Sequence, residues 1–175
     1  MIPELERVLD ASYVTALAER TTDELREMRA ECNDLENGLS YVRRMAQGRI
    51  DLLNAEVKRL REDAGDGDDV ADLVDRLPEV LSDRDRPAGS GRVIQDLEPP
   101  EHVVEPLEAR LDAVVGPGII ASISDLDATE LSAAIAALRD LEAELSESRS
   151  RLHLTIDSVN SELADRYRSG EIPTG

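Results

Sequence analysis

The stretch 24–57 reads ELREMRAECNDLENGLSYVRRMAQGRIDLLNAEV. It contains no proline, and its apolar side chains recur at steps of three and four residues. This spacing is typical of a coiled-coil seam, where one face of a helix packs against a partner. The seam positions are Leu25, Met28, Cys32, Leu35, Leu39, Val42, Ala46, Ile50, Leu53, Val57 and Leu60. We therefore predict a first long helix over residues 22–62, with Thr21 and Glu24 forming a capping box at its start.

The composition of the whole chain agrees with a helical protein. It has 175 residues, three tyrosines and no Phe or Trp, which disfavours a β-sandwich built on aromatic pairs. The formal net charge is −19, which argues against direct binding of DNA or of an anionic membrane and favours a basic protein partner. No apolar run approaches a bilayer span, and no signal pattern opens the chain. We expect a cytoplasmic protein.

A second helical stretch has the same seam spacing. We expect it over residues 127–169, with Asp127 and Glu130 forming its capping box. Its seam positions are Leu131, Ala134, Leu138, Leu141, Leu145, Ser148, Leu152, Ile156, Val159 and Leu163. The predicted fold class is all-α, with two long antiparallel helices forming a coiled-coil-like hairpin.

The remaining segments predict little regular structure. Residues 1–21 are expected to form a short N-terminal helical arm, and residues 170–175 a disordered tail. Residues 63–126 are rich in acids, Gly and Pro, which predicts a flexible linker with short helices at 70–81 and 106–115. In the second of these, Pro106 is placed in the first turn and Gly116 acts as the stop.

The two long helices also contain an internal repeat. A shift of 106 residues aligns 24–57 with 130–163 without gaps, and 13 of the 34 aligned residues are identical. A shared seam explains matching leucines, but it gives no reason for polar residues to recur in register. Each copy carries Glu, Ser, Arg, an amide or imidazole, and Asp at spacings of four, three, four and four. These ten residues are Glu36, Ser40, Arg43, Gln47 and Asp51 in the first copy, and Glu142, Ser146, Arg149, His153 and Asp157 in the second.

We call each set of five residues a polar stripe. At about 100° per residue, the five offsets fall within an arc of about 80° and extend about 22 Å along the helix. In the first copy, every stripe residue directly follows a seam residue, so the stripe flanks the contact between the helices as the wall of a groove. On antiparallel helices the two copies would be related by an approximate two-fold axis.

The residue types in the stripes suit a guanine nucleotide. Arginine presents a planar fork to the O6 and N7 edge of guanine, and a carboxylate accepts from the N1 and N2 donors. Serine hydroxyls suit phosphate oxygens. A two-fold ligand with two guanines and two phosphates would match, and the further arginines Arg44, Arg49 and Arg151 would offset the acidity of the protein locally.

The stripe pattern, together with the stretch LSYVRRMAQGRIDLLNAE at 39–56, resembles the RsiG family of actinobacterial anti-sigma factors that depend on cyclic di-GMP. The resemblance covers both long helices. It implies that the helical pair holds cyclic di-GMP as an intercalated dimer. It also implies that the loaded form sequesters a sigma factor of the WhiG/FliA type and so represses transcription. The second copy departs from the family pattern, with His153 in place of Gln, and this predicts pH dependence.

Other functions remain open from the sequence alone. The chain could be a ligand-free coiled-coil adaptor, or an acidic decoy that masks a DNA-binding surface by charge. The helices could pair within one chain or exchange between two chains in a homodimer. We expect no enzymatic activity, since no group of residues supplies a nucleophile, a base and oxyanion donors together. We expect no metal, since the acidic run at Asp63, Asp66, Asp68 and Asp69 lacks the alternating ligands and the closing Glu of an EF-hand loop.

Overall fold

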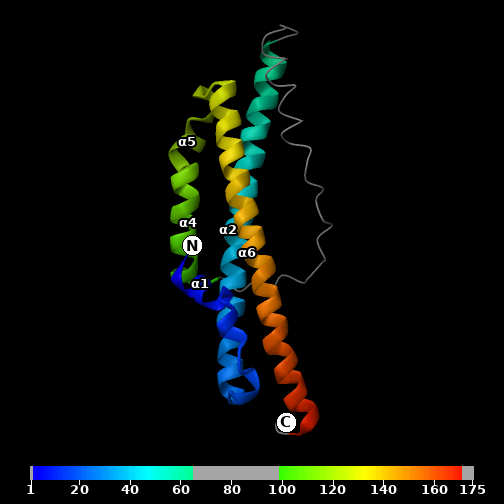
Figure 1. The fold of residues 1–175 in the computed structure, drawn as a ribbon. Coiled ribbons are helices and arrows are strands. Elements are labelled where there is room, and N and C mark those ends of the chain that lie inside the picture. The colour runs from blue at the N-terminus through cyan, green and yellow to red at the C-terminus, as the bar shows by residue number, and fades with distance from the viewer. Residues whose placement is uncertain (1, 65–98, 171–175) are drawn as a thin grey trace. The chain divides into compact units, whose positions relative to one another are not determined.

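The computed structural model describes residues 2–64 and 99–170, and this part of the chain contains helices and no strands (Figure 1). The predicted all-α class is confirmed. The short helix expected at 70–81 and the tail from 171 onward lie outside the described residues. The elements are α1 (Pro3–Leu9), η1 (Ala11–Val14), η2 (Leu17–Glu19), α2 (Thr22–Ala64), α4 (Glu101–Val114), α5 (Pro117–Ala121), η3 (Ile123–Asp125) and α6 (Ala128–Ser169).

The starts of the two long helices are fixed by side-chain caps. The backbone N–H of Glu24 donates to Thr21 Oγ1 at 3.2 Å, and the Glu24 carboxylate accepts from the Thr21 N–H at 2.6 Å. The same reciprocal pair joins Asp127 and Glu130, at 2.8 and 2.9 Å. Both predicted capping boxes are confirmed, and each satisfies two N–H groups that would otherwise lack a helical partner.

The chain divides into two compact units, and each long helix contributes a segment to both. The first unit comprises Met1–Arg44, Glu98–Arg110 and Ala143–Gly175, and the second comprises Met45–Leu97 and Leu111–Glu142. In the first unit, Arg26 of α2 donates to the hydroxyl of Tyr167, and Glu36 further along α2 accepts from Arg149. The contact further along α2 is thus made to a residue earlier in α6. Helices α2 and α6 therefore pack antiparallel, as predicted.

Nearly all predicted seam positions are buried in their unit. In the first unit, the buried seam residues are Leu25, Cys32, Leu35, Leu39, Val42, Leu145, Ser148, Leu152, Ile156, Val159 and Leu163. In the second unit, they are Ala46, Ile50, Leu53, Val57, Leu131, Leu138 and Leu141. The seam prediction is wrong at Ala134, which is half-buried while Ile135 is buried instead. The larger isoleucine removes more apolar surface from water. Met28 and Leu60 are also only half-buried.

Helix α4 begins earlier than the sequence predicts. The expected helix at 106–115 starts instead at Glu101, so Pro106 lies inside it and not in its first turn. The N–H groups of Val103 and Val104 donate to the carbonyl of Pro100, which opens the helix one turn upstream. Burial of the apolar side chains at steps of four outweighs the local cost of the internal proline. These side chains are Val103, Leu107 and Leu111, with Val115 just beyond the helix.

Gly116 does not end α4 in the left-handed conformation. Its φ is −77°, and it serves as the N-cap of α5.

Gly38 marks the place where α4 packs on α2 in the first unit. A Cβ at this position would lie 2.5 Å from Cγ1 of Val103, which is buried. On α6, Glu144 occupies the position equivalent to Gly38 in the repeat, and it accepts from Arg110 of α4 at 2.9 Å. The two copies therefore differ at the position that α4 contacts.

We expect Gly38→Ala to destabilise the protein by about 1–3 kcal/mol, because the rigid valine side chain has to move away from the new methyl group. Alanine favours a helix by about 1 kcal/mol over glycine, so the clash must exceed that gain. Chemical denaturation measures the effect. Adding Val103→Ala should recover part of the loss, and strictly additive costs of the two substitutions would contradict the close contact.

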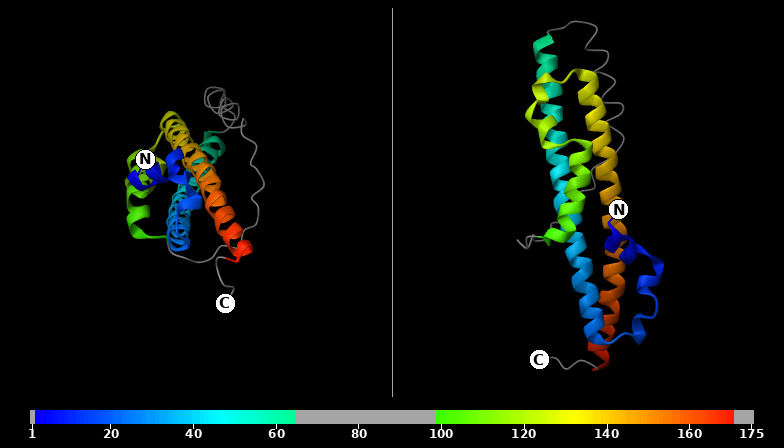
Figure 2. Two further views of the ribbon diagram at one scale, coloured as in Figure 1. Left: turned by 60° about the horizontal axis from the view of Figure 1, so that its bottom comes forward. Right: turned by 90° about the vertical axis from the view of Figure 1, so that its left-hand side faces the viewer.

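The N-terminal arm, residues 2–20, lies against the first half of α2 and the last part of α6 (Figures 1 and 2). Ile2, Leu5 and Val8 bury their side chains in the first unit. The guanidinium of Arg166 donates to the carbonyls of Leu17 and Ala18 at 3.1 and 3.2 Å. Because backbone carbonyls accept these bonds, the bonds do not depend on which side chains the arm carries at Leu17 and Ala18.

Candidate functional site

The structure gives the two polar stripes the same pattern of burial. In both copies the first four residues are half-buried and the fifth, Asp51 or Asp157, is exposed. The half-buried residues are Glu36, Ser40, Arg43 and Gln47 in the first copy, and Glu142, Ser146, Arg149 and His153 in the second. Each stripe residue also follows a buried seam residue. The stripes therefore border the helix contact, at a depth where side chains meet both the opposite helix and solvent.

In the first unit, three stripe residues converge on the carboxylate of Glu36. Arg149 Nε donates to Glu36 Oε1 at 2.7 Å, and Ser40 Oγ donates to the same oxygen at 3.0 Å. His153 Nε2 lies 3.3 Å from that oxygen. Glu36 is 21% exposed, so these contacts are made in a partly desolvated site. The first copy thus supplies a carboxylate that accepts from Arg149 of the second copy.

Burial raises the pKa of Glu36, but hydrogen bonds from Arg149 and Ser40 and the charge of Arg149 outweigh burial, so the pKa lies below its ordinary value. The ionised carboxylate therefore stabilises the fold fully above the ordinary value of 4.5. This contribution is lost as the pH falls through the lower, folded-state pKa.

We expect Glu36→Gln to cost about 1–3 kcal/mol of stability at pH 7, the usual worth of hydrogen bonds to a charged group, and to cost less as the pH falls below about 4.5. Urea unfolding at several pH values measures the difference. The control is Glu27→Gln at an exposed position of α2. If the free energies of unfolding of Glu36→Gln and of the unsubstituted protein differ by the same amount down to pH 3, the assigned role of the Glu36 carboxylate is excluded.

In the second unit, the equivalent contact joins Gln47 and Glu142. Gln47 Nε2 donates to Glu142 Oε1 at 3.3 Å. In the repeat, Glu142 corresponds to Glu36 and Gln47 to His153. The contact between Glu36 and His153 is thus made a second time by the corresponding residues, at the same distance. The sequence pattern assigns these residues to two stripes, and in the structure they pair across the two helices.

The stripe and α4 lie on opposite sides of the seam in the first unit. Ser40 follows the buried Leu39 by one residue, and Gly38 precedes it by one. At about 100° per residue, these two positions project to either side of the seam. Because α4 packs at Gly38, it covers the side away from the stripe. Among the described residues, α4 does not cover the side that carries Glu36, Ser40 and Arg149.

Two of the additional arginines have structural partners. Arg49 donates to Asp112 of α4 at 2.6 Å and to the carbonyl of Val115, and its side chain is 12% exposed. Arg151 donates to the carbonyl of Leu9 at 3.2 Å. Neither residue recurs in the other copy of the repeat, where Thr155 and Met45 stand. This lack of recurrence is the sequence signal that separates them from the stripe.

A carboxylate of one stripe meets an amide or imidazole of the other stripe once in each unit. Each unit holds a carboxylate that can accept from guanine N1 and N2, beside an amide or imidazole. Arg149 adds a planar donor beside Glu36, and Ser40 adds a hydroxyl that can turn to a phosphate oxygen. Among the described residues, no group of three or more His, Cys, Asp or Glu side chains is placed to hold a metal ion.

Comparison with known proteins gives one result for this chain. The model of a family described as RsiG-like matches residues 11–81, a range that contains all of α2 and the first polar stripe. This confirms the predicted resemblance for that part of the chain. No match is found among curated proteins or among solved structures. In residues 2–64 and 99–170, no helix is both long enough and apolar enough to cross a bilayer.

Proposed function

We propose that this chain, which matches the RsiG-like family over residues 11–81, is an anti-sigma factor that binds cyclic di-GMP through its two polar stripes. One observation carries the proposal. The contacts of Glu36 with His153 and of Glu142 with Gln47 have the same length of 3.3 Å and join equivalent positions of the repeat. A repeated polar site of this kind suits a ligand that itself has two equal halves.

Each half-site would bind one guanine and one phosphate. In the first unit, the Glu36 carboxylate would accept from the guanine N1 and N2 donors, and Arg149 would turn from Glu36 to the O6 and N7 edge. Ser40 would donate to a phosphate oxygen. In the second unit, Glu142 would accept from the other guanine as Glu36 does, with the amide of Gln47 beside it. The bonds that Glu36 accepts from Arg149 and Ser40 hold these three side chains in one arrangement.

The partner we propose is a sigma factor of the WhiG/FliA type, which the family match supports. A ligand that contacts residues of both α2 and α6 favours one relative position of the helices, and so favours one form of any surface that both helices build. Sigma would bind that form and be kept from RNA polymerase. The net charge of −19 would speed the encounter with basic regions of sigma.

Isothermal titration calorimetry with cyclic di-GMP tests the proposal, with GTP and cyclic di-AMP as controls. We expect selective binding at micromolar affinity or better, with more than one ligand per chain. The titration is repeated with a WhiG-type sigma factor present, in order to detect a binding site to which sigma contributes residues. No heat in either titration would reject the ligand and leave the ligand-free adaptor. Sigma binding that disappears at high salt, whether or not cyclic di-GMP is present, would favour the acidic decoy.

A further inference from the structure

The two half-sites differ at one position in a way that changes their chemistry. The carboxylate of Glu142 faces the amide of Gln47, whereas the equivalent carboxylate of Glu36 faces the imidazole of His153. An amide is neutral at every physiological pH. An unperturbed histidine gains a proton near pH 6.5, within the range in which cells operate.

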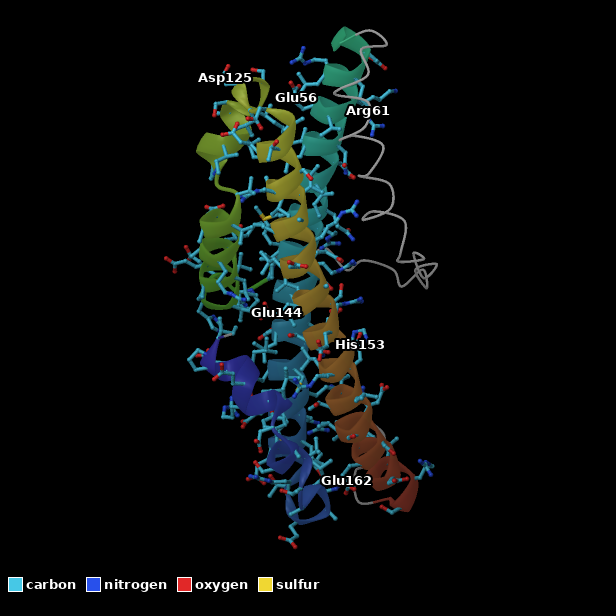
Figure 3. The ribbon with its side chains drawn as sticks, turned by 45° about the horizontal axis from the view of Figure 1, so that its top comes forward. Glu56, Arg61, Asp125, Glu144, His153 and Glu162 are labelled. Atoms are coloured by element: carbon cyan, nitrogen blue, oxygen red, sulfur yellow. The ribbon has the colours of Figure 1, made fainter. Side chains whose placement is uncertain are left out.

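Charged groups of both long helices lie around His153. Glu36 of α2 lies 3.3 Å from its Nε2 and also binds Arg149. On α6, Arg149 and Asp157 lie four residues before and after His153, and so on the same helix face. His153 is 36% exposed on α6, where Figure 3 labels it. A proton can therefore reach the ring from solvent.

We infer that His153 makes one half-site, and only one, bind the anionic ligand more tightly as the pH falls from 7.5 to 5.5. This inference rests on the proposed function. A neutral imidazole that donates from Nε2 to Glu36 leaves Nδ1 as an acceptor, whereas the protonated ring donates from both nitrogens. Protonation adds one positive charge beside Glu36 and Arg149, and that charge attracts the ligand phosphates.

The carboxylate of Glu36 does not contribute to this pH dependence of the affinity. The pKa of Glu36 lies below its ordinary value because the bonds from Arg149 and Ser40 and the charge of Arg149 together outweigh the effect of burial, which raises it. Glu36 therefore stays ionised down to pH 5.5 and contributes no change of charge in that interval. In the second unit, the contact between Gln47 and Glu142 has no group that titrates there.

The repeat supplies a matched pair of substitutions for the test. His153→Gln gives the first unit the side chain that the second unit already has, and Gln47→His does the reverse. Cyclic di-GMP affinity is measured by calorimetry at pH 5.5, 6.5 and 7.5 for the unsubstituted chain and both variants. Far-UV circular dichroism at each pH checks that all three proteins are equally helical.

We expect the unsubstituted chain to bind roughly twofold to fivefold more tightly at pH 5.5 than at pH 7.5, the range of a partly exposed charge interaction. His153→Gln should bind equally at the two pH values, and Gln47→His should show a steeper dependence than the unsubstituted chain. Equal pH dependence in the unsubstituted chain and His153→Gln would overturn the inference and leave the proposed function intact. Absence of binding at every pH, with helicity retained, would overturn both.

Discussion

Replacement of Leu152 by alanine is expected to lower the free energy of unfolding by about 2–5 kcal/mol, the usual cost of a large-to-small change in a packed core. Leu152 is 0% exposed and lies in the seam of the first unit. The loss combines the transfer free energy of the removed methyl groups with the cost of the cavity left behind. Denaturation by urea, followed by circular dichroism, measures it.

Leu154 provides the matched control two residues away. It lies on the same helix, but its side chain is 69% exposed. Leu154→Ala should change stability by no more than about 0.5 kcal/mol, as is usual at an exposed position. Equal effects of the two substitutions would show that α6 does not present this face to α2. The pair thus tests the rotation of α6 about its axis, on which the position of the stripe depends.

The long helices could be predicted because the same pattern determines their structure and their burial. Steps of three and four residues put apolar side chains on one face, and the buried residues of α2 and α6 follow that pattern. Ile135 was missed because Ala134 also satisfies the spacing, and only the packing of the second unit selects the larger side chain.

Helix α4 was predicted poorly because tertiary packing decides where it starts. A proline at 106 argues locally for a helix that begins there, whereas the burial of Val103 against α2 extends the helix upstream. Gly38 is a sequence signal that another segment packs closely on α2. Glycine inside a helix costs about 1 kcal/mol and often marks a place where another backbone approaches. Nothing in the sequence identifies which segment makes that approach.

The stripe residues could be predicted because the repeat preserves polar identities, but their pairing could not. The sequence gives no distance between Glu36 and Arg149, which lie 113 residues apart. Their contact depends on the register of two antiparallel helices, which the packing of the seam determines. Gln47 and Glu142 lie 95 residues apart and pair within the second unit, and the sequence gives no distance for them either.

Arg149→Ala is expected to reduce the affinity for cyclic di-GMP by about tenfold to a hundredfold, because a bidentate arginine contact to guanine is worth about 1–3 kcal/mol. The substitution also removes the charge that holds the Glu36 carboxylate at 2.7 Å. Glu36 would then present an uncompensated negative charge to an anionic ligand. Calorimetry on the variant measures the loss, and Arg43→Ala, the equivalent change in the first copy, should weaken binding in the same direction.

Arg168→Ala is the control for the general loss of a positive charge. Arg168 is also on α6, pairs with Asp165 at 2.7 Å and is 73% exposed, and it lies outside the stripe. If attraction to the ligand depended only on total charge, Arg149→Ala and Arg168→Ala would weaken binding equally and by a small factor that salt removes. A site built from the stripes requires a much larger loss for Arg149→Ala than for Arg168→Ala, because Arg149 bonds to the Glu36 carboxylate that would read the guanine and Arg168 pairs with Asp165.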